Sequence, residues 1–199
     1  MARFLTRLVR RFYGLPQPEI KQCDLIVPLG YGLTVHNTLP GAEINVLREA
    51  VHLAKRYEAR VAWASSKYFF HGSKDEEDKR KLSLLAEYGI TNPLIARGIT
   101  NSVTEAREIR AAVLRRGIKP HTIVVVLNWP HARSARLIWK ETFPDANILM
   151  YSVEGEWNRY HRATLQRSNG LWLFACILRD LTLRIKGLEW VAQRQHPAD

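Results

Sequence analysis

One histidine in the sequence occupies a position suited to acid–base chemistry. His131 belongs to the stretch Asn128-Trp129-Pro130-His131, which follows the apolar run IVVVL. Proline is favoured in the first turn of a helix, so this stretch predicts a helix with Asn128 as its N-cap and His131 in its first turn. Free N–H groups at a helix N-terminus attract anions, and an imidazole there can donate to a ligand or move a proton. His131 is therefore our main catalytic candidate, and the alternative is a surface histidine without a role.

Other polar residues could bind the charge of a ligand. Arg133 and Arg136 follow His131 on the same predicted helix, where one could reach the ligand while the other stays in solvent. A polar cluster at the start of a further predicted helix contains Asn101, Ser102, Thr104 and Glu105. Ser102 and Glu105 have the S-x-x-E spacing of a capping box, which would explain both without a ligand. The binding and capping interpretations both stay open.

Glycines and serines follow the first two predicted strands. Gly30-Tyr31-Gly32 could form a tight turn in which the backbone approaches a ligand and Tyr31 covers it. Ser65 and Ser66 could donate to phosphate or carboxylate oxygens. The alternatives are a glycine turn without a ligand and ordinary serines at a strand end. The pattern is not GxGxxG and no helix starts directly after it, so as a dinucleotide fingerprint it is weak.

The elements that must position these residues alternate along the chain. Short apolar runs rich in β-branched residues occupy 24–29, 61–64, 94–96, 122–127 and 147–151. Helical patterns occupy 41–57, 74–88 and 102–116, and a fourth begins at 130. Such alternation favours right-handed βαβ crossovers, so we expect a three-layer, Rossmann-like, doubly wound α/β fold with a mainly parallel five-stranded sheet and extra C-terminal helices. In this fold ligands bind outside the carboxyl ends of the strands, where the candidates above are expected to lie.

The length and composition of the chain limit its possible domain organisation. With 199 residues we expect a single α/β core at 23–155, preceded by a basic amphipathic segment at 1–22. Residues 156–199 should form two helices with a hinge near 168–170, packed on the sheet edge and ending in a polar tail. The net charge of +11 favours an anionic partner. The cysteines and histidines lack metal-ligand spacing, so no metal is predicted.

The location and the partner classes are also constrained. The sequence has neither a signal peptide nor an apolar stretch approaching the roughly 20 residues that cross a bilayer, so we expect a cytoplasmic protein. Phe4, Leu8 and Phe12 alternate with arginines near the N-terminus. This amphipathic pattern could dock peripherally on the anionic surface of the inner membrane, or it could pack on its own domain. Nucleic-acid binding is disfavoured because no RNP, zinc-finger or helix-turn-helix signature accompanies the charge.

The ordered set of these segments resembles the SanA/YdcF-like family, a bacterial group of unknown function with envelope-associated members. VPLGYG is similar to the family's opening strand and glycine turn, and Glu77, twelve residues before Gly89, looks like the acidic residue that starts its second helix. NSVTEA is similar to the polar N-T-x-E-N motif, with Glu105 matching and Ala106 departing.

Two later segments extend the resemblance, which covers about 24–186. VVLNWPHARSARLIW is similar to the family's strand, loop, histidine and arginine-alanine helix, with His131 matching. Ser134 stands at the usual arginine position, so Arg133 or Arg136 would have to substitute. LRDLTLRIKG is similar to a C-terminal helix of SanA-type members.

The resemblance implies a Rossmann-like fold and a pocket lined by the glycine turn, Glu77, the polar helix start and His131. It implies a nucleotide-like ligand such as S-adenosylmethionine, a role in envelope assembly and no settled reaction. We therefore expect a protein that binds an anionic or nucleotide-like small molecule. It would be either a small enzyme of cell-envelope metabolism, with His131, Glu105 and Glu77 as catalytic residues, or a non-catalytic envelope-assembly or membrane-surface binding factor.

Overall fold

The computed structural model describes residues 9–30, 32–66, 74–154, 160 and 168–194, with the backbone alone at 66, 74–77, 169 and 194. Its sheet contains five strands in the order β3-β2-β1-β4-β5, and each neighbouring pair is parallel. The strands are β1 (Leu25–Pro28), β2 (Arg60–Ser66), β3 (Leu94–Ile99), β4 (Thr122–Asn128) and β5 (Asn147–Val153). The order reverses between β1 and β4, which places the topological switch point there.

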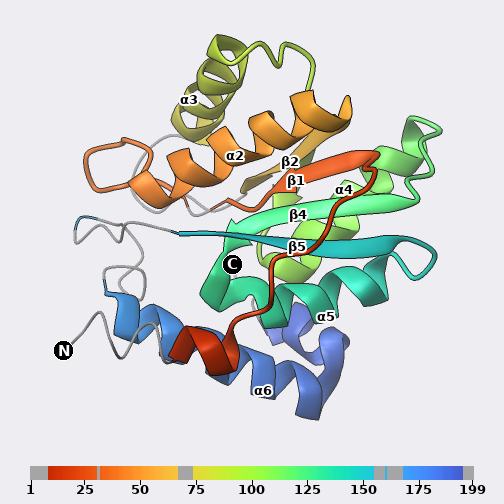
Figure 1. Ribbon diagram of the computed structural model, residues 1–199. Coiled ribbons are helices and arrows are strands. Elements are labelled where there is room, and N and C mark those ends of the chain that lie inside the picture. The colour runs from red at the N-terminus through yellow and green to blue at the C-terminus, as the bar shows by residue number, and fades with distance from the viewer. Residues whose placement is uncertain (1–8, 31, 67–73, 155–159, 161–167, 195–199) are drawn as a thin grey trace.

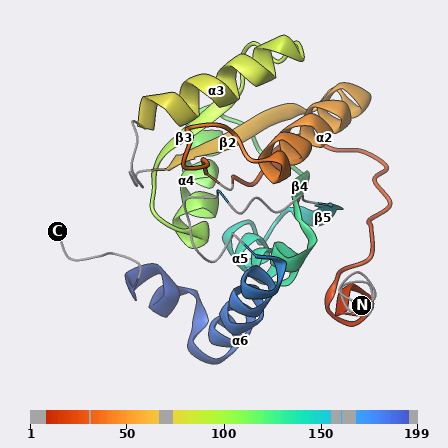
Figure 2. The ribbon, with the colours of Figure 1, turned by 90° about the vertical axis from the view of Figure 1, so that its left-hand side faces the viewer.

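Helices cover both faces of the sheet (Figure 1). They are α2 (Gly41–Tyr57), α3 (Lys74–Glu87), α4 (Ser102–Arg115), α5 (Ala132–Thr142) and α6 (Asn169–Arg194), with a short 3-10 helix, η1 (Trp129–His131), before α5. α2 and α3 pack on one face, and α4 and α5 pack on the other (Figure 2). This arrangement confirms the predicted three-layer, doubly wound fold.

The alternation of side chains along the central strands explains the two layers of core. Val125 of β4 contributes to the core under α4 and α5, whereas Val124 and Val126 contribute to the core under α2. Every residue of β4 is buried, as the continuous apolar run predicts for a strand covered on both faces.

α6 lies outside the three layers and differs from the prediction. It packs against α5, η1 and α4, not on the sheet edge. The expected hinge near 168–170 stays a prediction, because α6 begins at Asn169 and residues 161–167 before it lie outside the described residues. α6 itself has a kink at Gly187, where φ is +80°. The first of the two expected helices, in 156–167, falls almost wholly outside the described residues. Within the described parts, no helix combines the length and the apolar character that crossing a bilayer requires.

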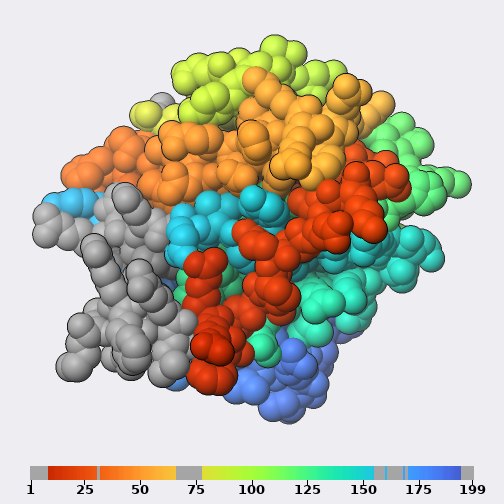
Figure 3. Space-filling view, in the orientation of Figure 1, coloured from red at the N-terminus to blue at the C-terminus, as the bar shows by residue number. Residues whose placement is uncertain are grey.

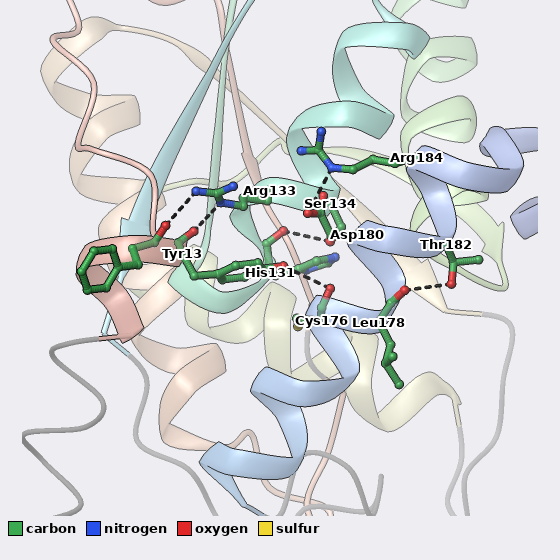
Figure 4. A network of polar contacts seen from close by, with 10 residues as sticks. Tyr13, His131, Arg133, Ser134, Cys176, Leu178, Asp180, Thr182 and Arg184 are labelled. Atoms are coloured by element: carbon green, nitrogen blue, oxygen red, sulfur yellow. Dashed lines mark hydrogen bonds and ion pairs between the residues drawn. The ribbon is translucent and has the colours of Figure 1, made fainter.

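The described end of the N-terminal segment packs on its own domain. Residues 9–13 are helical. Arg133 donates from Nε to the Tyr13 carbonyl (2.6 Å) and from Nη2 to the Phe12 carbonyl (2.9 Å), and the Tyr13 hydroxyl donates to the Cys176 carbonyl on α6 (3.2 Å) (Figure 4). Residues 1–8, which carry most of the expected amphipathic pattern, lie outside the described residues.

Two side chains fix the path that leads into β1. The Gln17 amide donates to the Ser152 carbonyl on β5 (2.7 Å) and accepts from the Ser152 N–H (2.9 Å). Oδ2 of Asp24 accepts from the backbone N–H groups of His121 and Thr122, each at 2.8 Å. The segment therefore runs over the surface across β5 before it enters the sheet (Figure 3).

Candidate functional site

An arginine of α6 contacts the start of α4 and the 3-10 helix η1 that follows β4. Nη1 of Arg179 donates to Oγ of Ser102 (3.0 Å) and lies 3.1 Å from Nε2 of His131, and the Ser102 and His131 atoms are 3.5 Å apart. The guanidinium also lies 5.5 Å from the centroid of the Trp172 ring. Polar side chains from three elements that are distant in the sequence thus meet beyond the carboxyl end of β4. We call Ser102, His131 and Arg179 the arginine cluster.

The surroundings of His131 determine its protonation state. Burial, reinforced by the positive charge of Arg179, lowers the pKa of His131 well below its ordinary value. Because Arg179 offers only donors, Nε2 must accept, and the ring proton lies on Nδ1. Nδ1 is buried and has no hydrogen-bond partner among the described residues. The imidazole is therefore neutral and acts as an acceptor through Nε2.

A second cluster lies beneath the turn after β1. Nζ of Lys81, on α3, lies 3.0 Å from Oε1 of Glu43, on α2, and the two side chains are 2% and 1% exposed. A Cβ added to Gly30 would lie 2.8 Å from that Nζ atom, so any other residue there would require the ammonium group to shift. The backbone of Gly30 hydrogen-bonds the carboxyl group of Glu105, on α4. We call Glu43, Lys81 and Glu105 the buried charge cluster.

Glu105 is held in its neutral form. Burial raises the pKa of its carboxyl group to about 8; Lys81 opposes this shift and Glu43 reinforces it. Glu105 is therefore mainly protonated at neutral pH and can donate a hydrogen bond. Arg179 also acts on the pKa of Glu105, so the two clusters are electrostatically connected.

The predicted capping box is wrong by one residue. Oδ1 of Asn101 accepts from the N–H groups of Val103 and Thr104, each at 2.9 Å, and Oγ1 of Thr104 accepts from the N–H of Asn101 at 2.9 Å. Asn101 and Thr104 thus form the cap of α4. Ser102 and Glu105 belong instead to the arginine cluster and the buried charge cluster.

The arginines predicted to bind charge lie elsewhere. Arg133 holds the N-terminal segment through the carbonyls of Phe12 and Tyr13, and Arg136 is exposed. The structure places neither against His131, where Arg179 stands instead. The helix start also differs from the prediction, because η1 precedes α5 and the Asn128 side chain makes no capping hydrogen bond.

The remaining candidates are placed only in part. Ser65 is buried and donates to Oδ2 of Asp78 on α3 (2.8 Å), which gives it a structural contact. Gly32 has φ +75°, a conformation that favours glycine. Ser66 ends β2 and Glu77 lies in α3, but both side chains, and the whole of Tyr31, lie outside the described residues.

Three residues of the two clusters were missed in the sequence, although each has a recognisable signal. Glu43 stands three and four positions before Val46 and Leu47, on the apolar face of α2. Lys81 precedes buried Leu85 by one helical turn, and Arg179 follows buried Cys176 by three positions. A charged residue on the buried face of an amphipathic helix is the pattern that could have identified all three.

Two surface cavities lie away from both clusters. One, of about 410 Å³, is lined by α4, α5 and α6, and it includes Arg107 and Glu189. The other, of about 370 Å³, includes Lys119 and His121, which precede β4, and so opens at the opposite end of the sheet. Neither cavity is lined by a residue of the clusters.

The described residues contain no group of three or more His, Cys, Asp and Glu side chains arranged to hold a metal ion. Comparison of the sequence with protein-family models finds no match, and comparison with curated proteins finds none either. The functional argument therefore depends on the geometry of the two clusters.

Proposed function

We propose that this chain is a SanA/YdcF-like protein that binds an anionic, phosphorylated or nucleotide-like small molecule at the carboxyl ends of its strands and acts on it as a small enzyme of cell-envelope metabolism. The observation that carries the proposal is the meeting of Arg179, His131 and Ser102 within 3.0–3.5 Å beyond β4. The position supports it, because β4 borders the topological switch point of the sheet.

The arginine cluster is suited to binding an anion. A guanidinium carries five N–H donors in a planar fork, and the contacts of Arg179 with Ser102 and His131 both use Nη1. The Arg179 side chain also hydrogen-bonds the Cys176 thiol, and its remaining N–H groups can donate to phosphate oxygens together with the Ser102 hydroxyl. The N-terminus of the 14-residue helix α4 lies beside them and adds the positive end of its dipole.

Two neighbouring groups are suited to moving protons. Neutral His131 is an acceptor through Nε2 and can serve as a general base once an anion draws Arg179 away from it. Glu105 keeps its proton at neutral pH and can serve as a general acid. Glu77 stays a third candidate for orienting polar groups of the ligand, as the resemblance implies.

Binding is tested by mass spectrometry of small molecules released from the purified protein, followed by thermal-shift measurements with nucleotides, S-adenosylmethionine and sugar phosphates. A ligand at 100 times its Kd should stabilise the fold by about 2.7 kcal/mol. Arg179→Met should weaken binding at least about tenfold, the scale expected for losing a charge-assisted hydrogen bond. The matched control is Arg136→Met, an exposed arginine of α5.

Catalysis is tested separately with His131→Gln, which keeps a polar side chain at the same place. An enzyme should lose turnover of the bound compound while its affinity changes little. Binding without turnover in the wild-type chain would favour the alternative, a non-catalytic envelope-assembly factor. The absence of any released molecule or any stabilising compound would contradict the proposal as a whole, as would equal binding by the Arg179→Met variant.

A further inference from the structure

The outward face of α6 carries a row of exposed apolar side chains. Phe174 and Ile185 are 59% and 74% exposed, and the leucines between them are about half exposed. We call this row the apolar stripe, and its members are Leu171, Phe174, Leu178, Leu181 and Ile185. Their spacing of three and four residues places them on one side of the helix, over a length of about 21 Å.

Two charged residues in the middle of α6 face its own domain, whereas Arg184, Lys186 and Glu189 are exposed. Arg179 turns inward to Ser102 and His131, and Asp180 is buried and paired with Arg184 (3.2 Å). Figure 4 shows the Leu178 side chain pointing away from His131. The inward face of α6 thus combines Arg179 and Asp180 with apolar side chains such as Cys176 and Leu183, while an apolar row faces outward. Soluble monomers seldom expose large contiguous apolar patches unless a partner or a membrane covers them.

Two partners could cover such a row: a second copy of the chain or a lipid bilayer. The net charge of the chain distinguishes them. The three-four spacing would also suit pairing with a second copy of the helix. Two copies that each carry a net charge of +11 repel one another, whereas an anionic lipid surface attracts that charge. Each basic residue held near such a surface adds to this attraction.

A second exposed apolar side chain lies in the segment that contacts α6. Phe12 is 72% exposed, and it follows Arg10 and Arg11. The next residue, Tyr13, donates its hydroxyl hydrogen bond to the carbonyl of Cys176 in the middle of α6. An exposed aromatic ring and exposed Arg11 thus belong to a segment that is hydrogen-bonded to α6, while Arg10 pairs with Glu154. Exposed apolar and basic side chains are the composition of interfacial membrane-binding surfaces.

We propose that the apolar stripe of α6 docks on the surface of an anionic lipid bilayer. The apolar side chains enter the boundary between headgroups and acyl chains, while basic residues contact the lipid phosphates. The opposite side of the same helix supplies Arg179 to the arginine cluster. Docking does not require the proposed ligand or its turnover, so it extends beyond the proposed function.

Cosedimentation of the full chain with vesicles tests the docking. Phosphatidylcholine vesicles are compared with vesicles that contain phosphatidylglycerol as well. The chain should bind the anionic vesicles, and raising the salt should weaken the binding because headgroup charges are screened. Leu178→Glu/Leu181→Glu should lower the partition coefficient at least about tenfold, since two charges would have to enter the apolar boundary.

The matched control is Val35→Glu/Leu114→Glu, which adds the same two charges at apolar positions that are 46% and 48% exposed elsewhere on the fold. It should retain most of the binding. Leu178→Ser/Leu181→Ser, which leaves the net charge unchanged, should also weaken binding. Circular dichroism establishes that each variant is folded. Equal partitioning of the stripe variants and the wild-type chain would overturn the proposal.

Sedimentation velocity without vesicles tests whether a second copy of the chain covers the apolar stripe instead. The wild-type chain should sediment as a monomer at micromolar concentration. A dimer that Leu178→Glu/Leu181→Glu dissociates would show that a second copy covers the stripe, and it would overturn the assignment to a bilayer. The Arg179→Met variant should bind vesicles like the wild-type chain, so failure of ligand binding and failure of docking are distinguished.

Discussion

The ammonium group of Lys81 lies 3.0 Å from a carboxylate oxygen of Glu43, and both side chains are almost completely shielded from solvent. Each partner comes from a different helix, and the backbone of Gly30 passes directly over the pair. Removing two charges from water costs several kcal/mol per ion, so such a pair is a poor means of stabilising a fold. Its place beside Glu105, beneath the turn after β1, associates it with the candidate site.

Lys81→Met should destabilise the protein by about 3–5 kcal/mol, because Glu43 would remain buried without this cation. Urea unfolding measures the change. Glu43→Gln/Lys81→Met should lose less than the sum of the single variants, since neither charge is then left behind. Lys79→Met, at an exposed position of α3, is the control and should stay within about 0.5 kcal/mol of wild type. Equal effects of Lys79→Met and Lys81→Met would show that the ion pair contributes nothing.

Gly30→Ala should destabilise the fold by about 1–3 kcal/mol, because the new methyl group would overlap the Lys81 ammonium group and separate it from Glu43. Thermal unfolding provides the measurement. Gly170→Ala is the control, since a Cβ there meets only Ser168 at 3.9 Å and alanine is the better helix former. A Gly30→Ala variant as stable as wild type would mean that Lys81 can move without cost.

Glu105→Gln should remove a pH dependence of stability. The pKa of Glu105 rises from 4.5 to about 8 on folding, so the native state binds the proton more tightly. Its stabilising contribution is complete below pH 4.5 and is lost as the pH rises through about 8. The free energy of unfolding of the wild type, relative to Glu105→Gln, should fall with a slope approaching about 1.4 kcal/mol per pH unit. Denaturant titrations between pH 5 and 9 measure it, and a constant difference would contradict the assignment.

Asn101→Ala should destabilise the protein by about 1 kcal/mol through loss of the α4 cap. Ser102→Ala leaves that cap intact and should cost less stability, while it weakens binding of the anion to the arginine cluster. Unfolding curves and thermal-shift binding assays separate the two effects. If Ser102→Ala destabilised the protein more than Asn101→Ala, the capping box of Ser102 and Glu105 would be the correct interpretation.

The architecture was predictable because it depends on short-range patterns. The apolar run 123–127 is continuous, as expected of a strand that is buried on both faces. Segments with helical periodicity separate it from the other apolar runs, which favours a parallel sheet. The end of β3 was not predictable, since Gly98 disfavours a strand. Ladder pairing with β2, which reaches Ser66 opposite Ile99, overrides that local preference.

The candidate site was predictable only in part, for a related reason. His131 and Glu105 follow strands that end at the same sheet edge, so the topology alone brings them near each other. Arg179 reaches His131 only because α6 packs against η1, and local sequence carries no sign of that long-range contact. The choice of Asn101 over Ser102 as the cap depends on the extended backbone at Asn101 (φ −159°), which residue type does not reveal.

The double hydrogen bond between Gln17 and Ser152 also affects how molecules of this protein meet. β5 is the last strand of its sheet, and an unpaired last strand is a template on which a foreign strand can add. The side-chain amide of Gln17 hydrogen-bonds the backbone N–H and the backbone carbonyl of Ser152, two groups on the open edge of β5. The segment before β1 therefore covers the edge of β5 at Ser152, and an added strand would have to displace Gln17 before it could pair there.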